Sequence, residues 1–568
     1  MQHPIGEHAL LADSRTAALI DPDGNVAWLC WPRIDSTPLL FSILDTDRGG
    51  TFVVRPARPD ARVVSRRYLP RSLVLETVWE AGGAQLIIED ALDLGEGPLL
   101  IRRLRTEGND VEVAVTVTAP DWPGARGSLR TLGNVLELDG GAGVAIHAPS
   151  EWQPHAGGTR SEFTVHPGSP AAVTLATAGT APRTPSIATT LSAWHEAMPV
   201  FRNLSAQPGL DGLLETTAAV LLGLRRHDGG IVAAPTTSLP QWPGSSRTWD
   251  YRYSWMRDSS LAALAMLRLG LLDAASSLGA FIGSVVNESG PLPLVRIDGT
   301  APPVETEIAE LAGYRGSRPV RIGNGAAAQA QLDVPGEVIE LATSLAKNAA
   351  LPAELATAVP VLADWLVHHW REPDNGIWEI RGAPRRYTHS LLTAISGLTG
   401  AASLADRHRV AGDATAWLQA AAAATAAIGE TGGALQIHLD GGGADAALAQ
   451  AALLSGLERF GARIDPTLDL IVERLDRGGL IDRHETQADT LGDPCAPFVF
   501  PTFWLARALA ASGRDGSRYL ETALATRGPL GLFGEVADPE DHMPLGNYPQ
   551  VQSHASFVLA VVPPEKAS

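Results

Sequence analysis

The spacing of apolar residues changes once along this chain, near residue 208, and this change constrains the fold more than any other feature. From about residue 15 to 180, apolar residues form short alternating or continuous runs, for example residues 73–79, 85–92 and 111–117. Turns rich in Gly, Pro, Asp and Asn separate the runs, which is typical of antiparallel strands. The sequence therefore predicts an N-terminal antiparallel β-sandwich domain over residues 1–185.

After Pro208, apolar residues return every three to four positions in long segments rich in Ala and Leu. This spacing predicts about a dozen helices of similar length, one of them over residues 444–460. Such helices, joined by loops of uneven length, favour a double ring of helices over a small bundle. We therefore predict a linker helix over residues 186–208 and a helical toroid over 209–568, with chemistry on the loops.

The charge balance and the cysteines restrict the partners and the compartment. The chain has 44 Lys and Arg and 63 Asp and Glu, which gives a formal net charge of -19 at pH 7. Binding to the phosphates of a nucleic acid requires a surplus of positive charge. No basic segment followed by an apolar one begins the chain, and every apolar run of membrane-spanning length is interrupted. The two cysteines, Cys30 and Cys495, fit a reducing compartment. We expect a soluble cytoplasmic protein that binds neither nucleic acid nor membrane; its oligomeric state is left open.

The densest group of functional side chains lies at residues 247–258, just before a predicted helix. It combines four aromatic rings with both signs of charge. Flat rings cover the apolar faces of a pyranose while carboxylate and guanidinium groups bind its hydroxyls, so the mixture suits a sugar site. In the alternative interpretation, Asp258 only caps the helix and the rings belong to the core.

Two glutamates stand on separate loops that contain glycine. Glu379 directly follows Trp378, and an apolar wall beside a carboxyl raises its pKa, as a general acid requires. Glu535 precedes the last predicted helix, where Asp538 or Glu540 competes for the same role. Two acids facing each other across a sugar, about 6.5 to 9.5 Å apart, are the machinery of an inverting glycosidase. The alternative for Glu379 is a solvated loop residue.

Other chemistries have little support in the sequence. There is no G-x-S-x-G, Walker A or H-E-x-x-H motif. His368, His369 and His389 are more typical of packing and polar networks than of metal ligands. This interpretation requires no metal and no cofactor.

Taken in order, a series of motifs resembles the bacterial branch of glycoside hydrolase family 15, the glucoamylase-like and trehalase-like enzymes. The motifs are residues 13–19, 28–36, 236–240, 249–258, 313–324, 376–379, 531–535 and 545–550. The resemblance implies a β-sandwich, a linker helix and an (α/α)6 barrel. It also implies that Glu379 is the general acid, Glu535 the general base, and Arg257 with Asp258 the clamp on the terminal glucose. The expected substrate-binding residues are Trp249, Tyr253, Trp255, Arg257, Asp258, Trp378 and Arg381.

The resulting hypothesis is an inverting, exo-acting α-glucoside hydrolase that releases β-glucose from a small carbohydrate. Trehalose is the first candidate substrate, and short maltose-type or isomaltose-type oligosaccharides are the others. Several positions depart from the family pattern: Ala27, Pro335, residues 390–393, residues 491–497 and Val536. They leave open a catalytically quiet carbohydrate-binding relative. Glucosyl transfer to phosphate or another acceptor also stays open, although the Glu535 loop offers no basic pocket.

Overall fold

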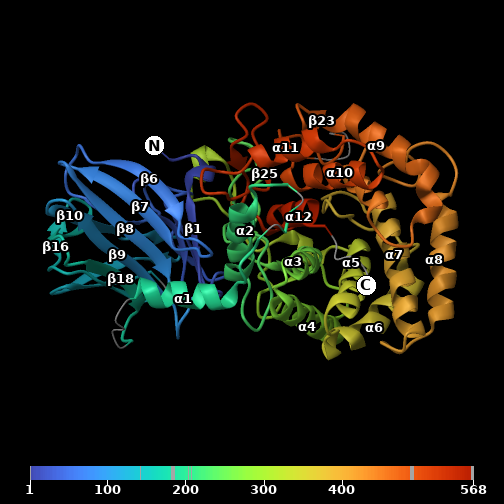
Figure 1. Cartoon of the computed structure of the whole chain (residues 1–568), viewed down its shortest axis with the longest axis horizontal. Helices are drawn as coiled ribbons and strands as arrows, with labels where there is room; N and C mark the ends of the chain where they lie inside the picture. The colour runs from blue at the N-terminus through green and yellow to red at the C-terminus, as the bar shows by residue number, and fades with distance from the viewer. Residues whose placement is uncertain are drawn as a thin grey trace.

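The protein, seen in a computed structural model, is described over residues 2–140, 143–180, 186–202, 204–205, 207–485 and 491–563. Its strands gather in an N-terminal part and its long helices in a C-terminal part, and the two lie side by side along the longest axis (Figure 1). The predicted fold class, an antiparallel β domain followed by a helical domain, is confirmed. The predicted boundary at residue 185 lies outside the described residues.

Three antiparallel sheets build most of the N-terminal part. The largest has the order β13 (Ser128–Leu132), β14 (Val135–Asp139), β15 (Val144–His147), β18 (Ala171–Thr177), β9 (Leu99–Glu107), β8 (Ala84–Leu92), β7 (Leu75–Ala81), β6 (Arg62–Tyr68). A second has the order β16 (Gln153–His155), β17 (Gly158–Val165), β10 (Val111–Thr118), β5 (Thr51–Pro56). The third has the order β1 (Ala9–Ala12), β2 (Ala17–Ile20), β3 (Val26–Cys30), β4 (Pro38–Leu40), and β11 (Asp121–Trp122) pairs with β12 (Ala125–Arg126).

Strand β10 shows why these residues form a sandwich. Its sequence alternates valine with Glu, Ala or Thr, and Val111, Val113, Val115 and Val117 are all buried. Because successive side chains of a strand point to opposite faces, the four valines lie on one face. That face joins the same apolar core as buried residues of the large sheet, such as Leu104.

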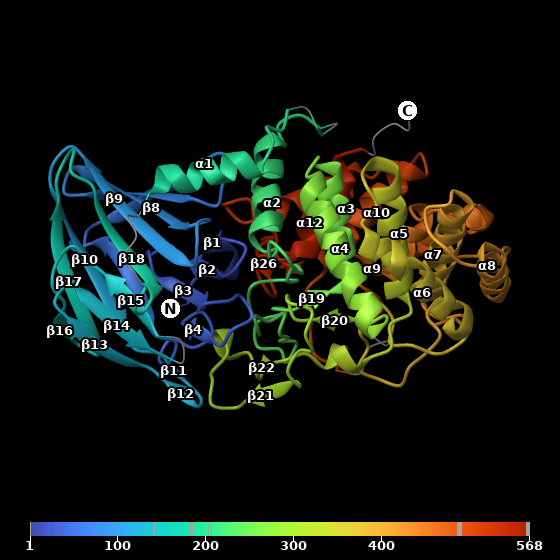
Figure 2. The ribbon, with the colours of Figure 1, turned by 90° about the horizontal axis from the view of Figure 1, so that it is seen from below.

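Helix α1 (Ile187–Ala197) packs on β8 and leads toward the helical part (Figure 2). Six helical segments then form a closed inner ring, each in contact with the next: α3 (Met256–Arg268), α5 (Asp333–Asn348), α7 (Thr388–Asp406), η4 (Ala446–Ala452), α10 (Val499–Ala511) and α12 (Val551–Val561). Outer helices cover them: α2 (Asp211–Gly223), α4 (Leu272–Ser289), α6 (Ala353–His369), α8 (Ala414–Ile428), α9 (Gly461–Leu475) and α11 (Ser517–Ala525).

One inner member differs from its predicted form. In place of a helix over residues 444–460, the chain forms two 3-10 helices, η4 and η5 (Glu458–Phe460). Gly456 lies between them at φ 77°, a left-handed conformation that an α-helix does not contain. The short η4 still completes the ring, because it packs against α7 and α10.

The alternation of inner and outer helices decides where the site lies. Since the chain returns through an outer helix each time, the inner helices run in one direction and their N-terminal loops meet at one end of the ring. Small hairpins shape these loops: β19 (Ser254–Trp255) with β20 (Leu294–Val295), β21 (Thr306–Ile308) with β22 (Val320–Ile322), β23 (Asp476–Arg477) with β24 (Leu480–Ile481), and β25 (Val536–Ala537) with β26 (Pro544–Leu545). Short 3-10 helices also occur: η1 (Ile5–Glu7), η2 (Tyr314–Gly316) and η3 (Gly325–Ala328).

The N-terminal part braces this end of the ring. Trp28 donates its indole N–H to the carbonyl of Pro235 at 2.8 Å, and buried Arg252 donates to the carbonyl of Ser36 at 2.7 Å. Asp35 pairs with Arg296 at 2.8 Å. The β domain thus fixes the backbone of segments that carry the candidate site. Within the described residues, each helix is too short or too polar to span a bilayer.

Candidate active site

A pocket lies where the inner helices begin, and its space, together with the solvent at its opening, amounts to about 850 Å³. Its walls come from the loops before α3, α5, α7, α10 and α12. The lining residues are Ala233, Gln241, Arg247, Trp249, Tyr251, Trp255, Arg257, Asp258, Asn324, Ala326, Gln329, Ile377, Trp378, Glu379, Ile380, Arg381, Arg483, Leu491, Phe498, Phe500, Glu535, Gln550 and Gln552.

Arg257 and Asp258, in the first turn of α3, form the closed end of the pocket. Their side chains are only 8% and 5% exposed. Arg257 Nη1 lies 3.1 Å from Gln331 Oε1 and 3.3 Å from Asp333 Oδ2, so its guanidinium is held from behind. Burial raises the pKa of Asp258 to about 6, against the opposing charge of Arg257. Arg257 Nε and Asp258 Oδ2 form an ion pair at 3.5 Å, and neither atom has a hydrogen-bond partner in the described part of the chain.

A tight turn before α7 presents Glu379 to the pocket. Glu379 has φ 56°, and its N–H donates to the carbonyl of Gly376 at 3.1 Å. Gly376 is itself at φ 65°, and a Cβ there would lie 2.9 Å from the Tyr387 ring, so a glycine is required. The Glu379 carboxyl, 23% exposed, accepts from Trp255 Nε1 at 2.6 Å and lies 3.3 Å from Arg257 Nη2. Both contacts hold the carboxyl group in a fixed orientation.

Glu535 lies deeper, in the loop before α12. The residue is 5% exposed, and its oxygens accept from Tyr251 Oη at 2.5 Å and from Gln241 Nε2 at 3.0 Å. Burial raises the pKa of Glu535 to about 7, and the two hydrogen bonds oppose that rise. The carbonyl of Glu535 accepts from the N–H of Val499, which fixes the loop against α10.

Two touching aromatic rings connect the glutamates. The rings of Tyr251 and Trp255 meet edge to face with their centroids 5.6 Å apart. Tyr251 holds Glu535 and Trp255 holds Glu379, so both carboxyl groups reach one pocket from different loops. Of Glu535, Asp538 and Glu540 in the loop after α11, only Glu535 lines the pocket, and Asp538 accepts from the N–H of Glu540 at 2.8 Å.

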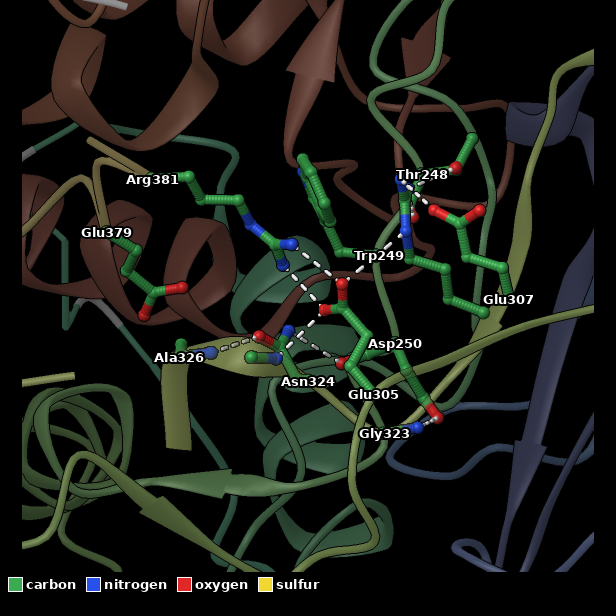
Figure 3. Close-up of polar contacts among 12 residues, drawn as sticks. Thr248, Trp249, Asp250, Glu305, Glu307, Gly323, Asn324, Ala326, Glu379 and Arg381 are labelled. Carbon is green, nitrogen blue, oxygen red and sulfur yellow. Dashed lines mark hydrogen bonds and ion pairs between the residues drawn. The ribbon is translucent and has the colours of Figure 1, made fainter. Parts of the chain in front are cut away.

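The open side of the pocket carries a cluster of charged residues around Trp249 (Figure 3). Arg381 and Arg321 place their guanidinium carbons 4.0 and 4.4 Å from the centroid of the Trp249 ring. Glu305 accepts from both terminal nitrogens of Arg381, at 2.7 and 2.6 Å, and lies 3.7 Å from Arg321. We call Trp249, Glu305, Arg321 and Arg381 the mouth cluster.

Two predicted contacts take another form in the structure. Tyr253 is 2% exposed, and its hydroxyl donates to Asp250 Oδ2 at 3.1 Å, so it supports the wall from behind rather than lining it. Trp378 lines the pocket, but its indole N–H donates to Asp445 at 2.8 Å and its ring stacks on Phe500. The polar contacts of the Glu379 carboxyl come from Trp255, Arg257 and Gln331.

Several residues of the site were not predicted from the sequence. Gln241, Gln329 and Asn324 are single polar residues in loops, and no spacing distinguishes them. Glu305 lies between two prolines and a short strand, 74 positions before Glu379, and only the fold brings it to Arg381. Gln241 directly follows the motif at residues 236–240, and Asn324 is the last residue of the motif at 313–324, so both positions carried a signal in the sequence.

Two of the departures from the family pattern, the segment 491–497 and Val536, lie close to Glu535. In the segment 491–497, Asp493 accepts from the N–H of Ser246 at 2.8 Å, and Cys495 Sγ lies 3.4 Å from Gln241 Oε1, the side chain that holds Glu535. Pro335 is buried in the first turn of α5, and Val536 is buried in β25. Nowhere in the described ranges do three or more His, Cys, Asp or Glu side chains form a group that could hold a metal ion.

Comparison with known proteins decides the family. The model of glycosyl hydrolases family 15 matches residues 208–562. The chain belongs to this family. A trehalase-like N-terminal model matches residues 1–175 of the same chain. This family 15 protein is accordingly a glycoside hydrolase, as the sequence predicted.

Curated relatives of this family 15 enzyme match along nearly its whole length. A trehalase of Mycobacterium tuberculosis is 33% identical, over 98% of this chain and 89% of its own. A trehalase of Mycolicibacterium smegmatis is 32% identical, over 98% and 91%. Among solved structures, a bacterial glucoamylase in complex with acarbose shares the fold, with a TM-score of 0.70 and 14% identity over 98% of this chain and 94% of that one. The fold likeness agrees with the predicted (α/α)6 barrel.

Proposed function

We propose that this glycoside hydrolase cleaves an α-glucosidic bond with inversion and releases β-glucose from a non-reducing end. Glu379 is the general acid and Glu535 the general base. One observation carries the proposal: two glutamates from different loops line one pocket, and each is held by one of two touching aromatic rings above a closed, charged end.

In the proposed reaction, Arg257 and Asp258 bind hydroxyls of the terminal glucose at the closed end. Glu379 gives its proton to the glycosidic oxygen as the bond from that oxygen to the anomeric carbon breaks. Glu535 takes a proton from a water molecule, whose oxygen bonds to the anomeric carbon from the other face. The leaving sugar departs with a new hydroxyl, and a proton must return from Glu535 to Glu379 before the next cycle.

The proposed substrate is trehalose, with short maltose-type or isomaltose-type oligosaccharides as alternatives. The relatives named trehalase, at 33% and 32% identity along nearly the whole chain, support this choice. A pocket closed at one end by Arg257 and Asp258 and open at the other suits attack on a terminal glucose.

Two variants and two substrates test the roles. Glu379→Gln should lower kcat on trehalose by about three orders of magnitude or more, yet affect α-glucosyl fluoride much less, because fluoride leaves without protonation. Glu535→Gln should abolish both reactions, because neither proceeds without an activated water. Glu540→Gln is the matched control, since Glu540 is exposed on the same loop.

The outcomes separate the assignments. Retained fluoride hydrolysis in Glu535→Gln but not in Glu379→Gln would reverse the two roles. Wild-type rates on trehalose in Glu379→Gln would remove it from the chemistry. The anomer formed first, followed by NMR, tests inversion, and α-glucose as the initial product would contradict it.

A second candidate is transfer to an acceptor other than water. Arg247 and Arg483 line the pocket, so basic side chains absent from the Glu535 loop reach it from other segments. Reaction in phosphate buffer should yield glucose alone if water is the acceptor. Formation of a glucose phosphate would instead favour transfer.

A further inference from the structure

We infer that the mouth cluster selects the leaving group, with Arg381 contacting the leaving sugar and Glu305 as the residue that positions Arg381. This inference rests on the proposed function, because it assigns the open side of the same pocket. Arg381 lines the pocket, while Glu305 holds it through two charged hydrogen bonds.

The exposure of the side chains gives the direction of the pocket. Asp258 and Arg257 are 5% and 8% exposed, Glu379 is 23% exposed and Arg381 is 31% exposed. A terminal glucose that fills the closed end therefore has its leaving partner toward Arg381, on the solvent side of Glu379. Arg381 also follows Glu379 by two residues, so its side chain lies near the glycosidic oxygen that Glu379 protonates in the proposed reaction.

Glu305 ties three segments together at this point. Its two oxygens accept from Arg381 at 2.7 and 2.6 Å, a bidentate pair across the gap between the loop before β21 and the loop that holds Glu379. The N–H of Gly325 also donates to Glu305, at 2.8 Å. The side chain is 16% exposed, and burial tends to raise its pKa, but the hydrogen bonds from Arg381 and Gly325 outweigh that effect and hold the pKa below its ordinary value.

Trp249 fixes the plane of the Arg381 guanidinium. Figure 3 shows Arg381 on one side of the Trp249 ring and Glu307 on the other. Arg321, which pairs with Glu307 at 3.3 Å, has its guanidinium carbon 4.4 Å from the centroid of the Trp249 ring, and two guanidinium groups this close to one ring cannot share a face, so Arg321 covers the second face. Both faces of Trp249 are thus occupied by guanidinium groups, and the ring supports Arg381 while it also lines the pocket.

Together these contacts give an arginine with a fixed position and with N–H donors beyond the two used by Glu305. Such donors suit the hydroxyls of a leaving sugar and have no partner in a leaving group without hydroxyls. A site built to hydrogen-bond hydroxyls discriminates against groups that lack them. The mouth cluster is therefore expected to matter for a disaccharide and to matter little for α-glucosyl fluoride, whose leaving group is one atom.

The experiment compares Glu305→Gln with Glu307→Gln. Glu307 is the matched control, because it stands two residues away, pairs with the same Arg321 and is 62% exposed. We expect Glu305→Gln to lower kcat/KM about ten- to a hundredfold on trehalose, or on whichever disaccharide the wild type prefers. On α-glucosyl fluoride the fall should stay below about threefold, the size of a small surface effect. Glu307→Gln should change neither value.

Arg381→Lys is the second variant, in case Glu305→Gln lowers expression. It keeps the charge but loses the bidentate geometry, so it should shift the same ratio of kcat/KM values in the same direction. Equal losses on both substrates would mean a merely structural role and overturn the inference, and so would unchanged values on both. A wild type that cleaves the fluoride but no disaccharide would also overturn it. A wild type that cleaves neither would overturn the proposed function itself.

Discussion

The closed end of the pocket and its mouth use the same residue types in opposite proportions. At the closed end one guanidinium, Arg257, faces the carboxyls of Asp258, Asp333 and Glu379. At the mouth one carboxylate, Glu305, lies between Arg321 and Arg381. The pKa shifts follow: burial raises the pKa of Asp258 to about 6, whereas arginine contacts bring that of Glu305 below its ordinary value.

The difference indicates that the two ends of the pocket have separate roles in substrate binding. A buried end with surplus carboxyl groups binds uncharged hydroxyls as donors and acceptors, and it meets the glucose that every substrate shares. The mouth is partly exposed and held by neutralising ion pairs, so it is rigid without being deeply desolvated. We therefore expect substitutions at the closed end to affect every substrate, and those at the mouth to change the preference among them.

The largest expected effect compares Arg257→Ala with Arg381→Ala. Loss of Arg257 removes a contact made to the terminal glucose in both the ground and transition states, so kcat and KM should both worsen. We expect kcat/KM to fall about a hundredfold or more on trehalose and on α-glucosyl fluoride alike, by analogy with breaking a buried charged pair. Arg381→Ala should lower kcat/KM mainly on trehalose. Equal profiles for the two variants would contradict the division between closed end and mouth.

A smaller effect concerns the pH profile. Glu535 must be ionised to act as a base, and its pKa is raised from 4.5 to about 7, so kcat/KM should decline as the pH falls below about 7. The Tyr251 hydroxyl favours the ionised form through its hydrogen bond, and Tyr251→Phe should move this acid limb about one pH unit higher.

Tyr253→Phe is the control for that measurement. Its hydroxyl bonds to Asp250 and not to either glutamate. The profile of Tyr253→Phe should keep the wild-type midpoint. An acid limb far below pH 7 in the wild type, or one that Tyr251→Phe leaves in place, would count against Glu535 as the base.

The smallest effect concerns stability. Burial, and next to it Asp333, raises the pKa of Glu337 in α5 from 4.5 to about 8. The folded protein therefore holds a proton that the unfolded chain loses above about pH 4.5, and this group weakens the fold as the pH rises from there to about 8. Glu337→Gln removes that loss, so its Tm should exceed the wild-type Tm by about 2 °C or more at pH 8 and by less at pH 5.

Thermal melting of Glu305→Gln tests the opposite pH dependence for a carboxyl group at the mouth. Because the pKa of Glu305 is lowered, its contribution to stability is present above about pH 4.5 and is lost as the pH falls through the folded pKa. The Tm of Glu305→Gln should therefore be lower than the wild-type Tm at pH 8, and the two Tm values should approach each other in acid. The same direction of change in both variants would contradict the opposite pKa shifts of Glu337 and Glu305.

The sequence predicted the two domains and both glutamates, but not how the side chains around them are used. Apolar periodicity found the sandwich and the helices because burial imposes a repeat of two on strands and of about 3.6 on helices. It failed at residues 444–460, where Gly456 breaks a pattern that still looks helical. Glu379 and Glu535 stood out through glycine-containing loops, whereas the catalytic roles given to them remain predictions.

The amino-acid sequence by itself determined the order of the domains, the family and which loops carry acids and aromatic rings, because these depend on local periodicity and on motifs of a few residues. Only the tertiary structure decided that Trp249 supports two arginines, that Tyr253 points away from the pocket and that Glu305 reaches Arg381. Those contacts join residues far apart in the chain, and the direction of a side chain depends on which neighbours the closed ring of helices brings to it.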